Sequence, residues 1–236
     1  MNNIFKWLAP LFFSAAVFFI PVHSLSQAST DYYDSYEQLA KHEVLNEDYE
    51  INYEKRNSDI SILAIHGGGI EPGTSEAVKN LANQINYSYY LFEGIKPSNN
   101  LILHINSKDF DEPIGREMAQ NSVSALTIHG YAEEESIVYL GGRNRDYKEK
   151  IRHSLQKRGF HVEDAPDDIA GMSIKNIVND NQLKKGVQIE LTAGLRKSFF
   201  ENHDWSRKNR ENTTEIFDQF IDGLREATAE YEVSLK

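Results

Sequence analysis

The chain has 236 residues, a formal net charge of −11 at pH 7 and no cysteine. That length can bury one substantial core, and the acidic balance argues against general affinity for nucleic acid or anionic lipid. Without cysteine there are no thiolate ligands, so any transition metal must be held by histidine, aspartate or glutamate.

The start of the chain differs in composition from the rest. A single early cation, Lys6, precedes an apolar run over residues 7–22, and a polar stretch with small residues then leads to Ala28. This layout is typical of a secretory signal peptide, and the run is short for a membrane span. We therefore predict that residues 1–28 are a signal peptide cut after Ala28 and that residues 29–236 form a single domain. The mature protein is expected to be secreted or held at the cell-envelope exterior, without membrane insertion.

Residues 29–55 are polar and aromatic, and we predict a linker there with one short helix followed by extended chain. From residue 60 onward, short apolar runs alternate with stretches of helical periodicity. The predicted strands are 60–65, 101–105, 125–128, 136–140, 160–163 and 186–191, and the predicted helical segments are 75–85, 113–121, 146–157, 174–178 and 213–231. This alternation predicts an α/β fold, a three-layer sandwich whose central sheet is mixed but mostly parallel.

Potentially reactive side chains lie in or directly after several of these strands. His66 and His129 each end a strand just before a glycine, and Glu190 lies in the apolar run VQIELTAGL. In an open α/β sheet, ligands bind at the carboxyl ends of the strands. We therefore expect these three side chains to converge on one edge of the sheet.

The segment HGGGIE places His66 and Glu71 at the two ends of a glycine-rich turn. Three glycines allow a tight turn, so an imidazole and a carboxylate can return to one point. A third ligand from another strand would complete a catalytic zinc centre with one position open to water. His129 is the favoured third ligand. His104, inside its predicted strand, is the alternative third ligand. If it does not bind the metal, it contacts one of the metal ligands and orients it.

Two other interpretations of these residues stay open. A histidine at a strand end beside a glycine turn is often only a structural residue with satisfied hydrogen bonds. An HGGG loop can also form the oxyanion hole of an esterase, but such an enzyme needs a G-x-S-x-G nucleophile motif. That motif does not occur in this sequence.

Glu190 and two arginines are the candidates for catalysis. Glu190 has apolar neighbours, which is unusual for an acid in a strand that faces helices on both sides. We predict that it takes the proton of the attacking water and passes it to the leaving nitrogen. Arg143 and Arg196 follow strands and are expected at the same edge, where a guanidinium would bind a substrate carboxylate or the oxyanion. A solvent-facing glutamate on an edge strand, and arginines on a solvated surface, are the alternatives.

In these segments the chain resembles the phage-type poly-γ-glutamate hydrolases and their bacterial relatives. The resemblance rests on LAIHGGGIEPGTSE (63–76), LHINSKDFDEP (103–113), LTIHGY (126–131), GGRN (141–144) and NIVNDNQLKKGVQIELTAGLR (176–196), which occur in the same order. It implies a fold similar to the zinc carboxypeptidases and endolytic cleavage of the γ-amide links of poly-γ-glutamate. It also implies that His66, Glu71 and His129 hold one zinc ion and that Glu190 lies on the general-base strand.

The expected activity is therefore hydrolysis of γ-glutamyl amide bonds in a polyanionic peptide polymer by a secreted zinc enzyme. One alternative is a zinc amidase that acts on another γ-linked substrate, such as peptidoglycan stem peptides. Another is a non-catalytic surface module that binds a polyanion. Because protein and polymer are both acidic, the substrate cleft is expected to be locally basic, with Arg143, Arg196 and nearby lysines supplying the charge.

Overall fold

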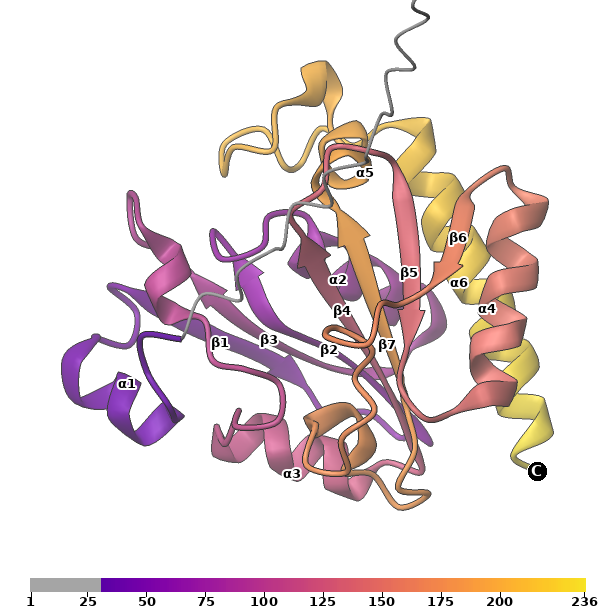
Figure 1. The fold of residues 1–236 in the computed structure, drawn as a ribbon, viewed down its shortest axis with the longest axis horizontal. Helices are drawn as coiled ribbons and strands as arrows, with labels where there is room; N and C mark the ends of the chain where they lie inside the picture. The colour runs from indigo at the N-terminus through magenta and orange to yellow at the C-terminus, as the bar shows by residue number, and fades with distance from the viewer. Residues whose placement is uncertain (1–30) are drawn as a thin grey trace, which may run out of the picture. The chain divides into compact units, whose positions relative to one another are not determined.

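Seven strands form the central layer of residues 31–236, which is the part of the chain that this computed structural model describes (Figure 1). The signal peptide predicted for residues 1–28 lies outside the described residues. In the described part, no helix combines the length and the apolar character that a membrane span needs. The strands are β1 (Tyr49–Glu54), β2 (Ile60–Gly68), β3 (Ser88–Gly94), β4 (Ser124–Tyr131), β5 (Ile137–Gly141), β6 (His161–Asp164) and β7 (Val187–Thr192).

Helices and short 3-10 turns connect these strands. The α-helices are α1 (Tyr36–His42), α2 (Thr74–Ile85), α3 (Pro113–Asn121), α4 (Arg145–Lys157), α5 (Ala193–Ser198) and α6 (Glu215–Ser234). The 3-10 turns are η1 (Asn100–Leu103), η2 (Ile177–Asn179) and η3 (Glu201–His203). The helix predicted over residues 113–121 is confirmed at both ends. Its N-terminus is fixed by Glu112, whose carboxylate accepts the backbone N–H groups of Ile114 and Gly115.

The sheet order is β1-β3-β2-β4-β7-β5-β6. The four strands β3, β2, β4 and β7 are parallel neighbours, whereas β1 is antiparallel to β3 and β5 is antiparallel to β7. The arrows in Figure 1 show β4 and β7 running together and β5 running the opposite way. The predicted α/β fold with a mixed, mostly parallel sheet is thus confirmed. The carboxyl ends of β2, β4 and β7 meet at one edge, and β5 ends at the other.

Apolar clusters fill both sides of the sheet. On one side, Ile62 and Ile128 pack with apolar side chains from α2, α4 and α6. On the other side, Leu63 and Ala125 pack with residues from α1, α3 and the 3-10 turns. Because both faces are covered, the central strand β2 is almost continuously apolar rather than alternating, whereas β7 alternates apolar and polar residues.

Two sequence-based expectations are wrong. The short helix and the extended chain predicted within residues 29–55 are confirmed as α1 and β1, but the described part of this segment is not a linker, since Tyr33, Leu39 and Tyr49 are buried. Residues 101–105 do not form a strand but begin with the turn η1, in which Leu101 is exposed. A short apolar run has no periodicity that separates a strand from a helical turn. The place beside β2 belongs instead to β3, which the sequence patterns did not reveal.

Candidate metal centre

His66 lies near the end of β2, where the strand is irregular. Simple alternation would place it on the same face as Ile62, but the β2–β3 register shifts between Ala64 and Gly67. Bulges of this kind re-aim side chains beside functional sites. The Nε2 atom of His66 lies 2.8 Å from the carbonyl oxygen of Ile105. Because a carbonyl only accepts, Nε2 carries a proton, so Nδ1 is the ring nitrogen whose lone pair can bind a metal.

The glycine-rich turn after β2 returns Glu71 to His66. At Gly68, φ is 64° and a β-carbon would lie 2.5 Å from the carbonyl oxygen of Gly94, so only glycine fits there. Glu71 Oε1 lies 3.2 Å from His66 Nδ1. Glu71 Oε2 accepts the backbone N–H of Gly130 at 2.8 Å. The carboxylate is therefore fixed from two sides, and of these two contacts the HGGGIE segment predicted the one with His66.

His129 lies on β4, the strand that pairs with β2. Its Nδ1 atom is 3.1 Å from Nδ1 of His66 and 3.8 Å from Oε2 of Glu71. Burial, together with the neighbouring imidazole of His66, lowers the pKa of His129 to about 3. The ring is therefore neutral at physiological pH, which is the form that binds metals. Its Nε2 atom is buried and has no hydrogen-bond partner among the described residues.

His104 approaches the same point from the loop after η1. Its ring centroid is 3.9 Å from that of His66, and its Nε2 atom is 3.9 Å from Glu71 Oε1. Its Nδ1 atom lies 2.6 Å from Oδ1 of Asp31. Burial opposes the charged form, but the hydrogen bond to Asp31 and the charge of Glu71 outweigh it and raise the pKa of His104. No sequence signal indicated Asp31, which lies in the segment interpreted as a linker.

The donor set suits a metal such as zinc. His66, Glu71 and His104 each offer a ligand atom within 4.8 Å of the others, a group that could hold a metal ion. His129 approaches His66 and Glu71 at the shorter distances given above. Ligand atoms bound to tetrahedral zinc at about 2.0–2.1 Å lie roughly 3.3 Å apart. The separations of 3.1 and 3.2 Å around His66 Nδ1 are close to that spacing.

Glu190 lies on β7, directly opposite His129 in the register of β4 with β7. β7 is an inner strand and Glu190 is only 6% exposed, so the alternative of a solvent-facing edge glutamate is excluded. Gln188 Nε2 donates to Glu190 Oε1 at 2.8 Å, and Asn176 in turn donates to Gln188 Oε1. Burial and the negative charge of Glu71 raise the pKa of Glu190 well above its usual value. A carboxyl group with a raised pKa is suited to accept and return a proton.

These side chains share one cavity of about 400 Å³. Its wall includes all three histidines, both glutamates and the loop that carries Asp167 and Asp168. Among the described residues that line it, the single lysine or arginine is Lys108. Neither Arg143 nor Arg196 is among these lining residues, although the charge of Arg196 acts on Glu190 and opposes the rise of its pKa.

Arg196 lies beside the cavity with its guanidinium bonded to backbone carbonyls. Nε donates to Leu191 at 3.0 Å, Nη1 to Pro72 at 2.9 Å and Nη2 to Tyr131 at 3.3 Å. Burial lowers the pKa of Arg196, and the charges of two nearby glutamates oppose this. Arg196 therefore ties the end of β7, the turn after β2 and the end of β4 together.

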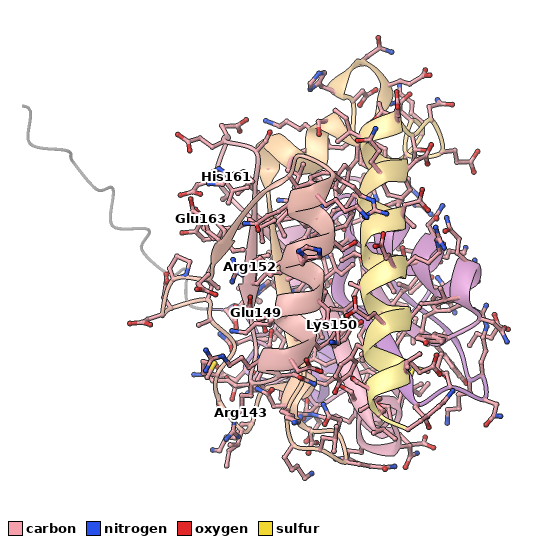
Figure 2. All side chains as sticks on the ribbon, turned by 90° about the vertical axis from the view of Figure 1, so that its right-hand side faces the viewer. Arg143, Glu149, Lys150, Arg152, His161 and Glu163 are labelled. Atoms are coloured by element: carbon pink, nitrogen blue, oxygen red, sulfur yellow. The ribbon has the colours of Figure 1, made fainter. Side chains whose placement is uncertain are left out.

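The expectation that Arg143 reaches the catalytic edge is wrong. Arg143 follows β5, and β5 runs antiparallel to β7, so its carboxyl end lies at the opposite edge of the sheet. Figure 2 places Arg143 near the start of α4, below Glu149 and Arg152. The apolar pattern of residues 136–140 is the same for either strand direction, so the sequence could not reveal this reversal.

The chain is similar to one known protein family and to individual bacterial proteins. A profile of the family described as poly-gamma-glutamate hydrolase matches residues 33–223. The UPF0714 protein YndL of Bacillus subtilis (strain 168) is 39% identical over 186 residues, which cover 77% of this chain and 71% of YndL. The UPF0714 protein YmaC of the same strain is 37% identical over 186 residues, which cover 78% of this chain and 77% of YmaC.

Two solved structures are similar throughout their length. A bacteriophage poly-gamma-glutamate hydrolase superposes with a TM-score of 0.85 at 35% identity, covering 88% of this chain and 100% of that one. A zinc-free apo form of YndL superposes with a TM-score of 0.81 at 36% identity, covering 86% of this chain and 99% of that one.

Proposed function

This chain belongs to the poly-γ-glutamate hydrolase family, and from that premise we propose that it is a zinc-dependent hydrolase of the γ-glutamyl amide bonds of poly-γ-glutamate. The observation that carries the proposal is the convergence of His66, Glu71, His129 and Glu190 on one cavity. The first three offer the nitrogen and oxygen donors that zinc prefers. The fourth is a buried acid of raised pKa within the same cavity wall.

The proposed ligands of the single zinc ion are Nδ1 of His66, the carboxylate of Glu71 and Nδ1 of His129. The short distance between the two Nδ1 atoms supports this set, as does the neutral state of His129. The Ile105 carbonyl fixes the tautomer of His66, an arrangement common behind metal-bound histidines. His104, held by Asp31, is the competing third ligand. In the favoured arrangement, His104 does not bind the zinc ion. It holds Glu71 in place and lines the part of the cavity that receives the substrate.

Glu190 performs the proton transfer. A bound zinc ion supplies Lewis acidity, which lowers the pKa of a water molecule and polarises the carbonyl group under attack. The Glu190 carboxylate accepts the proton of the attacking water and delivers it to the amide nitrogen that leaves. Gln188 holds Oε1 of Glu190, while Oε2 makes no hydrogen bond within residues 31–236 and is free to accept. Arg196 keeps the strand ends that carry these groups in register.

The proposed setting is outside the cell. Residues 1–28 have the pattern of a signal peptide, and residues 29–236 form the hydrolase domain. Export would bring the enzyme to an extracellular polymer. A zinc amidase that acts on γ-linked peptidoglycan stem peptides would need the same export and the same site. Parallel assays on purified polymer and on cell-wall fragments separate the two substrates.

Removal of the metal tests the proposal directly. Purified protein is expected to hold one zinc ion per chain and to release short glutamate chains from poly-γ-glutamate. Dialysis against a chelator should abolish that release, and added zinc should restore it. Metal analysis of each sample verifies that the ion has left and returned. Polymer cleavage that continues after complete zinc removal would contradict the mechanism.

A further inference from the structure

A second cavity, of about 560 Å³, lies where β5 ends and α4 begins. Three cationic residues line it, Arg143, Arg145 and Lys148. Asp167 and Met172 line both this cavity and the catalytic one. The loop that carries these two residues is therefore a shared wall, and a long flexible ligand could cross it from one cavity to the other.

The three cations lack partners in the part of the chain that the structure describes. Within residues 31–236, the side chains of Arg143, Arg145 and Lys148 make no ion pair and no hydrogen bond. Arg152, next to the cavity, pairs with two of its three acids, Glu149 at 3.5 Å and Asp164 at 2.6 Å, and Asp167 is the third. Figure 2 shows Glu149 and Arg152 along α4, above Arg143. Counting Arg152, four cations face three acids here, so this region is slightly positive on a protein whose net charge is −11.

The catalytic cavity has the opposite character. Among the described residues it contains Lys108 as its one cation, beside two glutamates and the exposed acids Asp167 and Asp168. Apart from the zinc ion proposed above, this cavity therefore offers little electrostatic attraction to a polymer with one α-carboxylate per unit. Guanidinium groups, by contrast, bind carboxylates through paired N–H donors. The catalytic cavity is thus suited to cleave the polymer, and the second cavity is suited to attract it.

We propose that Arg143, Arg145 and Lys148 form a subsite for α-carboxylates of the polymer at units remote from the bond that is cleaved. This inference rests on the proposed function. The subsite anchors a long chain across the shared loop, so that the cleaved segment stays at a high local concentration in the catalytic cavity. Short oligomers that fill only the catalytic cavity gain nothing from it.

Substrate length is the variable that tests the subsite. Arg145→Glu is expected to raise KM for long poly-γ-glutamate about three- to tenfold, because an exposed ionic contact is lost and repulsion replaces it. Its kcat, and its KM for a short γ-glutamyl oligomer, should match the wild type. The KM difference should shrink in about 0.5 M salt, which screens exposed charges. Arg145→Lys should retain most of the affinity for the polymer.

A matched control is Lys79→Glu, which reverses an exposed cation on α2 that has no ion-pair partner among the described residues. It is expected to change KM for neither substrate. An unchanged KM of Arg145→Glu on long polymer would overturn the subsite, and so would an equal rise on short and long substrates. A wild-type protein that cleaves neither substrate would overturn the proposed function, and the subsite with it.

Discussion

The two edges of the central sheet differ in the burial and the hydrogen bonding of their polar side chains. At the carboxyl ends of β2, β4 and β7, most of the charged and polar groups are buried and hydrogen-bonded to fixed partners, as His66 is to Ile105 and Arg196 to three carbonyls, with Nε2 of His129 as an exception. At the carboxyl end of β5, Arg143 and Arg145 are exposed and form no ion pair within residues 31–236. Buried groups need such partners, because an unsatisfied one costs about 1–3 kcal/mol. The first edge suits a fixed reaction geometry, and the second suits attraction of a mobile anion.

The sharpest way to test the buried edge is Glu190→Gln. The amide keeps the shape of the side chain but cannot accept the proton, so kcat should fall about 10²- to 10⁴-fold. Zinc content should stay at the wild-type level, because Glu190 is not among the proposed ligands. Turnover of poly-γ-glutamate and metal content are measured on the same preparation. A non-catalytic binding module would instead show no turnover in the wild type and equal polymer affinity in both proteins.

The identity of the third ligand is tested by the pair His129→Ala and His104→Ala. His129→Ala should abolish zinc binding at stoichiometric metal, because a three-ligand site loses a ligand. His104→Ala should weaken zinc binding only about 10- to 100-fold, as for residues that support a site from outside the ligand set. Competition with a chelator of known affinity measures both. The reverse ranking would make His66, Glu71 and His104 the ligand set.

Two arginine variants, one at each edge of the sheet, compare how much the two edges contribute to the free energy of unfolding. Arg196→Ala removes three hydrogen bonds to buried or half-buried carbonyls, so the free energy of unfolding should fall by about 2–4 kcal/mol. Arg143→Ala should change it by less than about 0.5 kcal/mol, as is usual for exposed residues. Chemical denaturation of the zinc-free proteins measures both without a contribution from the metal. Equal losses in the two variants would remove the distinction between the edges.

Sequence patterns predict well the sheet edge where β2, β4 and β7 end, because these strands are easy to recognise in the sequence. The runs that form β2 and β4 are mostly apolar, β7 alternates apolar and polar residues, and the reactive residues lie at or near the strand ends, so the sequence alone groups His66, Glu71, His129 and Glu190. Other features depend on contacts that no local pattern contains. Asp31 reaches His104 across 73 positions of sequence. The position of Arg143 follows from strand direction, which is a property of the assembled sheet.

The strand β4 contributes to the centre twice. Its His129 side chain faces His66, and the peptide N–H of the next residue, Gly130, holds Glu71. A one-residue slip of this strand against β2 would turn the imidazole away and withdraw the amide in the same movement. Ion capture and correct strand pairing are consequently cooperative, so the centre should assemble or fail as a unit instead of losing its donors one by one.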